Sequence, residues 1–308
     1  MTRVPASARP LPRPLAVAVG IMIDRAVGEP PAPVHPVALF GRAMTWFERH
    51  SYRDGRWAGA AHAAVGVAMG IVAGAVEGST VVASALALAG RSLGEAATDV
   101  GAALEAGDLE TARTLLPTLA GRDPSDLDAK EIARAAVESV AENTVDAVVA
   151  PALWAALAGA PGALGYRAVN TLDAMVGHRS PRYLRYGWAS ARLDDVAAWV
   201  PARATAALVA LVRPAAALDV WRSVRTQAPA HPSPNAGVAE AAFAAALGLR
   251  LGGLNRYGGR TELRPALGTG RPPGASDVAQ AVRLSHDVTT ALVVVLVLAG
   301  VGALGWRR

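Results

Sequence analysis

The stretch that decides the fold is residues 288–306, VTTALVVVLVLAGVGALGW, in which no side chain is charged. A helix rises 1.5 Å per residue, so about 20 apolar residues cross the hydrocarbon core of a bilayer. The 19 residues of this stretch therefore predict a membrane-spanning helix, with two arginines directly after it at the membrane surface. A helix buried inside a soluble protein is the alternative interpretation.

A second apolar stretch, residues 57–76, has glycine at every fourth position of its later half and just beyond it: Gly66, Gly70, Gly74 and Gly78. Residues four apart lie on one face of a helix. Glycine is costly in a water-exposed helix, but in a membrane it allows a neighbouring helix to approach closely. We therefore expect this face to pack against another helix.

The whole sequence predicts one all-α domain, residues 1–308, that crosses the membrane several times and carries polar catalytic loops and helices at one membrane face. The expected spans lie near residues 11–23, 57–76, 79–93, 147–169, 196–212 and 288–306, and the polar segments are residues 91–146 and 213–287. Residues 159–162, Gly-Ala-Pro-Gly, interrupt the fourth span and predict a kink or partial insertion. Within the second polar segment we expect ordered loop and one helix near residues 238–249.

The composition agrees with this class and excludes others. Hydrophobic residues make up 52% of the chain and charged residues 18%, against about 25% charged in soluble domains. The net charge of +5 would suit nucleic acid, but the arginines form no stripe and are not interleaved with aromatic residues, so no nucleic-acid partner is expected. The chain has no cysteine, which excludes disulfides, thiolate metal sites and cysteine nucleophiles.

Four carboxylates share one face of a predicted helix: Glu131, Glu138, Glu142 and Asp146 follow at offsets of seven, four and four. Like charges four residues apart repel. A solvated acidic face is the alternative, but such a face is normally interleaved with basic residues, and here Arg134 can pair with Glu131 or Glu138 and no basic residue follows until Arg167. Carboxylates beside apolar residues need a cation or an acid–base role, so we predict a divalent-metal or substrate site.

A second acidic group follows: Asp173 after one apolar stretch, and Asp194 and Asp195 before another. Oxygen ligands of this kind suit Mg²⁺, and capping of a helix N-terminus is the alternative role. Arg203 lies within an apolar stretch, where a charge is expensive and usually functional. It can clamp a phosphate or pair with one of these aspartates. Residues 233–237, Ser-Pro-Asn-Ala-Gly, suit a rigid anion-binding or substrate-binding turn, and an ordinary turn is the alternative.

Two familiar kinds of site are absent from the sequence. It contains no G-x-x-x-x-G-K-[ST] segment, so any ATP is not held by a Walker-type loop. Its six histidines show no H-x-x-x-H spacing, which argues against zinc catalysis.

Seven groups of residues follow one another from residue 24 to about residue 260, most of the chain. They are Asp24-Arg25 with Gly28-Glu-Pro30 and His35-Pro-Val37; Gly121-Arg-Asp123; Glu138-Ser-Val-Ala-Glu-Asn-Thr144 with Asp146; Asn170-Thr-Leu-Asp173; Ala191-Arg-Leu-Asp-Asp195; Pro201-Ala-Arg203; and Ser233-Pro-Asn-Ala-Gly237. Together they resemble the CobD/CbiB family of adenosylcobinamide-phosphate synthases. Three positions depart from the family pattern: Glu29 stands where Asp is usual, Ala147 where Gly is common, and Ala198 where Asn is frequent.

The resemblance implies ATP-dependent condensation of adenosylcobyric acid with (R)-1-aminopropan-2-yl phosphate, with ATP as co-substrate and Mg²⁺ as cofactor. From the residues and the resemblance together, the expected catalytic residues are Glu138, Glu142, Asp146, Asp194 and Asp195. The expected metal ligands are Glu142, Asp146, Asp173, Asp194 and Asp195. The expected substrate-binding residues are Asp24, His35, Arg122, Asp123, Asn143, Asn170, Arg192, Arg203, Ser233 and Asn235.

The expected location is the bacterial inner membrane, with the active face in the cytoplasm, where ATP and the corrinoid are. Membrane lipid is an expected partner, and the sequence is compatible with a homo-oligomer. The alternative function is a corrinoid-binding or transporting membrane protein without ligase activity, which would carry its acidic residues near mid-membrane. A membrane phosphotransferase acting on alcohol phosphates is disfavoured, because its D-G-x-x-A-R type of signature is absent.

Overall fold

The computed structural model describes residues 11–31, 33–121, 123–257 and 260–305. This part of the chain is helical apart from connections and one antiparallel β-hairpin. Its helices are α1 (Arg13–Val27), α2 (Pro36–Ser51), α3 (Arg56–Glu77), α4 (Thr80–Ala87), α5 (Gly90–Glu105), α6 (Leu109–Leu115), α7 (Ala129–Thr144), α8 (Ala150–Val176), α9 (Trp188–Ala197), α10 (Trp199–Val212), α11 (Ala217–Thr226), α12 (Ala236–Leu247) and α13 (Ala275–Gly305). The hairpin consists of β1 (Leu251–Tyr257) and β2 (Arg260–Leu267), and a π-helical turn, Val145–Val149, joins α7 to α8.

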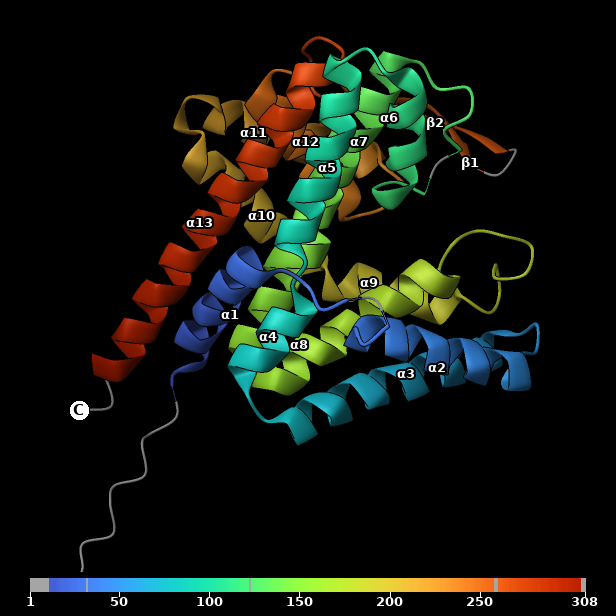
Figure 1. The fold of residues 1–308 in the computed structure, drawn as a ribbon, viewed down its shortest axis with the longest axis vertical. Helices are drawn as coiled ribbons and strands as arrows, with labels where there is room; N and C mark the ends of the chain where they lie inside the picture. Colours follow the sequence, from blue (N-terminus) through green and yellow to red (C-terminus); the bar gives the residue numbers. More distant parts are fainter. Residues whose placement is uncertain (1–10, 32, 122, 258–259, 306–308) are drawn as a thin grey trace, which may run out of the picture.

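Two groups of helices lie at opposite ends of the molecule, and α13 runs along both (Figure 1). One group holds α5, α6, α7, α11, α12 and the hairpin, and the other holds α1 to α4, α8 and α9. The N-terminal half of α13 packs on α5 and α7, whereas its C-terminal half packs on α1. One helix therefore connects the two groups.

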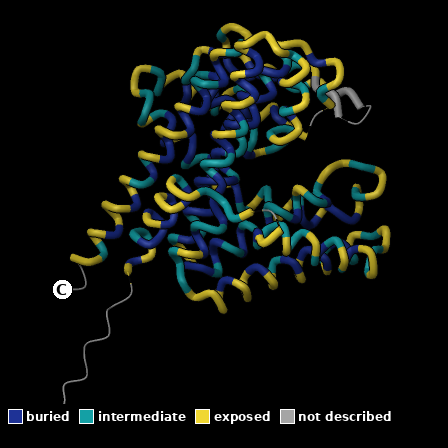
Figure 2. The backbone as a smooth tube through the Cα atoms, viewed as in Figure 1, coloured by how far each residue is buried: buried dark blue, intermediate teal, exposed yellow. Residues whose placement is uncertain are grey.

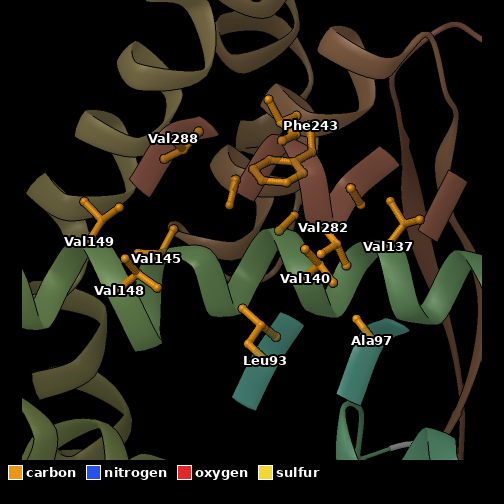
Figure 3. Packing of buried hydrophobic residues seen from close by; sticks show 14 of the residues in the cluster. Leu93, Ala97, Val137, Val140, Val145, Val148, Val149, Phe243, Val282 and Val288 are labelled. Atoms are coloured by element: carbon orange, nitrogen blue, oxygen red, sulfur yellow. The ribbon is translucent and has the colours of Figure 1, made fainter. Parts of the chain in front are cut away.

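The centre of the core is α7, which is enclosed by α5, α12 and α13 (Figure 3). Val140 of α7 is fully buried, with Leu93 of α5 on one side and Phe243 of α12 and Val282 of α13 on the other. Many of the buried residues around them are alanines, whose small side chains allow the helix backbones to approach closely. The helix that carries Glu138 and Glu142 is thus held rigidly.

Three helical stretches of the described residues are long and apolar enough to cross a membrane: α3, α13 and the continuous stretch Ala129–Val176. The pair α9 and α10, bent by 41°, makes a fourth if it is one span. The exposed faces of α3 and of the C-terminal half of α13 carry large apolar side chains such as Val72 and Leu298 (Figure 2). Apolar faces of this size require lipid. The prediction of an all-α, multi-pass membrane protein is confirmed.

The glycine face of α3 packs against α8, as the sequence predicted. A Cβ added to Gly70 would lie 2.6 Å from the Ala168 Cβ, and one added to Gly66 would lie 2.8 Å from Leu172 Cδ1. Gly74 of α3 is buried against the backbone of α8 at Ala160 and Pro161. Gly78 differs from the other three, because it ends α3 in the left-handed conformation at φ 69° with open space around it. The packing stripe therefore ends one turn earlier than expected.

The break expected at residues 159–162 is confirmed. Gly159 has φ 69° and ψ −150° inside α8, a conformation that only glycine adopts without strain, and Pro161 follows without an N–H to donate. Arg13 Nη1 donates a 2.7 Å hydrogen bond to the carbonyl of Leu157, one of the groups that the break leaves without a helical partner.

The break reverses the chain direction. The Tyr166 hydroxyl lies 3.4 Å from Asp146 Oδ1, although twenty residues of straight helix would separate the two by about 30 Å. The stretch expected to span the membrane at residues 147–169 is therefore a helical hairpin with its turn at Gly159. Such a hairpin brings side chains from both of its arms to its open end.

The stretch expected to span at residues 79–93 is not one helix, which corrects the prediction. The eight-residue α4 is about 12 Å long, too short to cross a bilayer. The chain turns at Leu88–Ala89, and α5 begins where the Asp24 carboxylate accepts hydrogen bonds from the backbone N–H groups of Gly90 and Arg91, at 3.1 and 3.3 Å.

The polar segment 213–287 contains more helix and strand than expected. It contains α11, the hairpin and the start of α13, in addition to α12, which confirms the helix expected near residues 238–249. Gly252 and Gly253, at φ 83° and 104°, form an irregularity in the hairpin register. Glycines and prolines predicted loop here because they rarely occupy strand interiors.

Candidate active site

The π-helical turn at Val145–Val149 places Asp146. The turn follows Thr144 and contains three valines, and such β-branched side chains fit an α-helix less well than unbranched ones. The Thr144 hydroxyl donates to the carbonyl of Val140 at 2.7 Å, and the Ser285 hydroxyl of α13 lies 2.8 Å from Thr144 Oγ1. Single π turns inside helices occur frequently at functional sites.

Five predicted carboxylates from three segments lie within electrostatic range of one another, each of at least one other. We call them the acidic cluster: Glu142, Asp146, Asp173, Asp194 and Asp195. Asn170 lies between two of its members and donates a hydrogen bond of 3.5 Å to Asp194 Oδ1. The hairpin turn at Gly159 is responsible, since it returns α8 to the level of Asp146.

Nearby positive charge only partly balances the acidic cluster. Arg167 attracts Asp146, and Arg192 Nη1 lies 3.4 Å from Asp195 Oδ2 in an exposed pair. Among the residues that the structure describes, two arginines face the five carboxylates, and Arg179 adds a weaker attraction on Asp195. A site with this excess of negative charge is suited to a cation or to a ligand that brings one.

The donor set limits how a metal would be held. Among the described residues, no three Asp, Glu, His or Cys side chains lie close enough to hold a metal ion together. A cage built only from protein ligands therefore does not fit. Mg²⁺ usually takes one or two carboxylates and completes its shell with water and substrate phosphates. Asp146 and Asp194, joined through Asn170, suit this mode.

A cavity of about 820 Å³, which we call the large cavity, opens beside the acidic cluster and shares Asp195 with it. Its wall carries several cationic and aromatic side chains. They are His178, Arg179, Tyr183, Trp188, Arg192, Arg203, Trp221 and Arg225. Arginines bind phosphates and carboxylates, and tryptophans offer flat faces for ring systems. The large cavity is therefore suited to a large anionic ligand with planar parts.

The wall of the large cavity is braced through Asn235. Its side-chain amide donates to the carbonyl of Asp195 at 2.8 Å, and its Oδ1 lies 3.3 Å from Arg203 Nη1. Arg203 stacks over Trp199, 4.1 Å from its ring centroid. Ser233 Oγ accepts from the backbone N–H groups of Asn235 and Ala236. The predicted turn thus positions Arg203 and Asp195 together.

A smaller cavity of about 150 Å³, the small pocket, lies on the other side of His231, which lines both cavities. Glu138 and Glu142 of α7, Glu240 of α12 and Arg264 of β2 line it. Glu138 accepts a hydrogen bond of 2.7 Å from the backbone of Gly252.

Two groups lie close to His231 Nε2, Glu240 Oε1 at 3.4 Å and Arg264 at a shorter distance, and the shorter contact favours a neutral ring. Arg264 donates to its Nε2 at 2.8 Å, so that nitrogen acts as an acceptor. Burial also lowers the pKa of His231 below its usual value of 6.5. With a neutral imidazole, the described lining residues of the small pocket comprise three carboxylates, Glu138, Glu142 and Glu240, and one cation, Arg264.

Comparison with known proteins identifies the family. The family described as CobD/Cbib protein matches residues 17–285. This chain belongs to the CobD/CbiB family. Curated relatives named cobalamin biosynthesis protein CobD include one from Mycobacterium tuberculosis, 49% identical over 302 residues that cover 93% of this chain and 95% of the relative. Another, from Chromobacterium violaceum, is 43% identical and covers 88% and 91%. No solved structure matches the chain.

In this CobD/CbiB protein, three further predicted residues have partners outside the acidic cluster. Asp24 caps α5. His35 caps the N-terminus of α2, and its Nε2 lies 3.0 Å from Glu29. Asp123 accepts from Ser125 within an exposed turn. Arg122 lies outside the described residues.

Asn143 is nearer to the acidic cluster than these residues. Its amide donates to Ser139, and it lines a cavity of about 360 Å³ together with Glu29 and Arg167. Arg167 also attracts Asp146, so this cavity adjoins the acidic cluster.

Sequence reasoning missed four residues of this CobD/CbiB site: Arg167, His231, Glu240 and Arg264. Two signals were available. Glu240 is the only charged residue of an otherwise Ala-rich helix, and His231 directly precedes the predicted turn at residues 233–237. Arg264 gave no signal, because its strand was interpreted as loop.

Proposed function

We propose that this protein catalyses ATP-dependent amide-bond formation between adenosylcobyric acid and (R)-1-aminopropan-2-yl phosphate, giving adenosylcobinamide phosphate. The observation that carries the proposal is the junction at Asp195, where the large cavity meets the acidic cluster. A ligase of this kind needs space for a large corrinoid with a free carboxylate beside a site for a nucleotide. The large cavity and the adjoining acidic cluster, in a chain of the CobD/CbiB family, support this proposal.

The reaction joins a side-chain carboxylate of the corrinoid to a primary amine. ATP activates the carboxylate by transferring a phosphoryl group to it, which gives an acyl phosphate and ADP. The amine then attacks the acyl carbon, the C–N bond forms, and the bond to the phosphate oxygen breaks to release phosphate. The ammonium must lose its proton before this attack.

Glu142 would accept that proton. It lines the small pocket and is also a member of the acidic cluster. An ammonium group is attracted to the small pocket because its carboxylates outnumber its cations. His231, which is neutral, separates this position from the large cavity. Arg192 and Arg203 of the large cavity would hold the phosphate of the amine substrate.

Mg²⁺ would be carried by Asp146 and Asp194 together with nucleotide oxygens and water. When bound, it neutralises charge on the transferring phosphoryl group. The protein's own part is to hold these carboxylates in a fixed position by the π turn and by Asn170. The proposed location is the bacterial inner membrane, with the site facing the cytoplasm because ATP and the corrinoid are there.

The test is turnover by the purified protein. The protein in detergent or lipid nanodiscs is supplied with adenosylcobyric acid, ATP, Mg²⁺ and the aminoalcohol phosphate, and the products are followed by mass spectrometry. We expect adenosylcobinamide phosphate and ADP in equal amounts. Corrinoid binding without ATP consumption would refute the ligase proposal and favour the binding or transport function.

A further inference from the structure

A separate cavity of about 640 Å³ lies where α1, α5 and α13 meet, and we call it the interfacial cavity. It shares no lining residue with the large cavity or the small pocket. Its charged wall is formed by Asp24 and Arg25 of α1 and by Arg91, Glu95 and Asp99 of α5, and the Asp24 carboxylate is already bonded to the backbone N–H groups of Gly90 and Arg91. The proposed reaction uses none of these side chains.

The interfacial cavity lies at the polar end of two apolar helices. Arg25 Nη2 donates to the carbonyl of His286 at 2.8 Å and to the Thr290 hydroxyl at 3.0 Å. At the other end of α1, Leu15 packs on Gly300, so α1 and α13 run antiparallel. On the side of Arg25 toward Leu15 and Gly300, residues 14–23 of α1 and 288–305 of α13 carry no charge. The level of Arg25 is therefore the boundary between apolar and polar surroundings.

Charges on α5 follow a fixed order from this boundary. Arg91, Glu95 and Asp99 are four residues apart, so they lie on one face at intervals of about 6 Å. The helix begins beside Asp24, at the level of Arg25, and runs away from the apolar ends of α1 and α13 (Figure 1). Positive charge therefore lies next to the apolar boundary, and negative charge lies one and two turns farther out.

The arginines retain donors for a ligand. Within the described residues, Arg25 uses only Nη2, and Arg91 uses Nε and Nη1, to Glu95 and to the carbonyl of Ala26. A guanidinium has five N–H donors, so each arginine has at least two left. The ion pair between Arg91 and Glu95 is exposed on both sides, and pairs of this kind are weak and exchangeable.

We propose that the interfacial cavity binds the headgroup of a membrane phospholipid that carries a phosphate and a terminal primary ammonium. The phosphate lies next to the acyl chains in such a lipid and meets Arg25 and Arg91, whereas the ammonium extends outward to Glu95 and Asp99. A phosphate-only headgroup would leave the two carboxylates facing an anion. A trimethylated ammonium has no N–H to donate. The inference is independent of the proposed ligase activity.

The test compares lipids that differ only in the headgroup. The delipidated full-length protein in detergent receives phosphatidylethanolamine, phosphatidylcholine or phosphatidylglycerol with identical chains, and bound lipid is counted by native mass spectrometry. We expect phosphatidylethanolamine to bind about tenfold more tightly than phosphatidylcholine, the effect of a charged hydrogen bond. Soluble phosphoethanolamine, which lacks chains, should not compete at equal concentration.

Variants then show which side chains cause the preference for phosphatidylethanolamine. The double variant Glu95→Gln/Asp99→Asn should bring the ratio of the two affinities to about one, because both substitutions keep shape and remove charge. The matched control is Glu105→Gln, which is exposed at the far end of the same helix and should keep the tenfold ratio. Equal binding of the lipids by the unmodified protein, an unchanged preference in the double variant, or full competition by soluble phosphoethanolamine would each overturn the proposal.

Discussion

Asp173, Asp194 and Asp195 lie near the carboxyl ends of their helices. Asp173 is three residues before the last residue of α8, and the other two fall within the last turn of α9. Capping of a helix N-terminus, the alternative role for these residues, is therefore wrong. The helix dipole disfavours negative charge at this end. Three aspartates kept at unfavourable positions and close to other carboxylates are better explained by a ligand than by stability.

This placement predicts that Asp194→Asn stabilises the fold while it disables the site. Asparagine keeps the shape and removes a charge that other carboxylates repel. We expect the free energy of unfolding to rise by about 1 kcal/mol and turnover to fall about 100-fold or more. Thermal unfolding and product formation measure the two effects. Asp219→Asn, at an exposed site in the first turn of α11, is the control and should leave turnover unchanged.

A second prediction concerns Asp24. Burial raises the pKa of its carboxyl above 3.8, so the folded protein holds this proton more tightly than the unfolded chain. Its contribution to stability is therefore full below pH 3.8 and is lost as the pH rises through the folded pKa. Asp24→Asn keeps an oxygen for the N–H groups of Gly90 and Arg91 and removes this loss.

We expect the Asp24→Asn protein to be at least as stable as the unmodified protein at pH 7, with the difference shrinking as the pH is lowered toward 4. Chemical denaturation at several pH values measures this. A variant that is less stable at pH 7 would show that the charge itself is needed for the cap. Turnover of the same variant tests the separate prediction that Asp24 binds substrate.

At the scale of elements, the sequence predicted what depends on local pattern. The glycine stripe of α3 and the break at Gly159 were both visible, because a repeat of four and a Gly-x-Pro-Gly segment have direct conformational meaning. The π turn at Val145–Val149 and the hairpin of β1 and β2 were not. Their formation depends on tertiary partners, such as Ser285 for the turn and Glu138 for the backbone of β1.

The α3 stripe gives a direct test at this scale. Gly70→Leu would place side-chain atoms where Ala168 and the Leu164 carbonyl already lie 2.6 Å from an ideal Cβ. We expect destabilisation by about 1–3 kcal/mol, the usual cost of overpacking. The control is Ala73→Leu on the exposed face of the same helix. Thermal unfolding in detergent compares them, and equal stability of the two variants would mean that the stripe does not pack on α8.

Over the whole molecule, the predicted carboxylates were easier to find than their surroundings. Glu142 and Asp146 stand out in sequence because their helix has few basic residues nearby. Their relation to Asp173, some 27 positions later, depends on the reversal at Gly159, and the contribution of His231 depends on how its loop folds back to α7. Site residues that come from distant segments have no fixed spacing in the sequence, so no motif indicates that they lie together.

The last prediction concerns α13, which connects the two groups of helices (Figure 1). A Cβ added to Gly101 of α5 would lie 3.3 Å from the Val278 Cβ of α13, close to the 3.5–4.5 Å range of disulfides. Because the chain has no cysteine of its own, the pair Gly101→Cys/Val278→Cys has no competing thiol. We expect it to cross-link on mild oxidation and to shift on a gel without reductant. The control pair, Gly107→Cys/Val278→Cys, should remain reduced, because Gly107 has open space around it. The linked protein should keep its turnover, since neither position lines a cavity of the site, and failure to cross-link would mean that α13 does not dock on α5 as described.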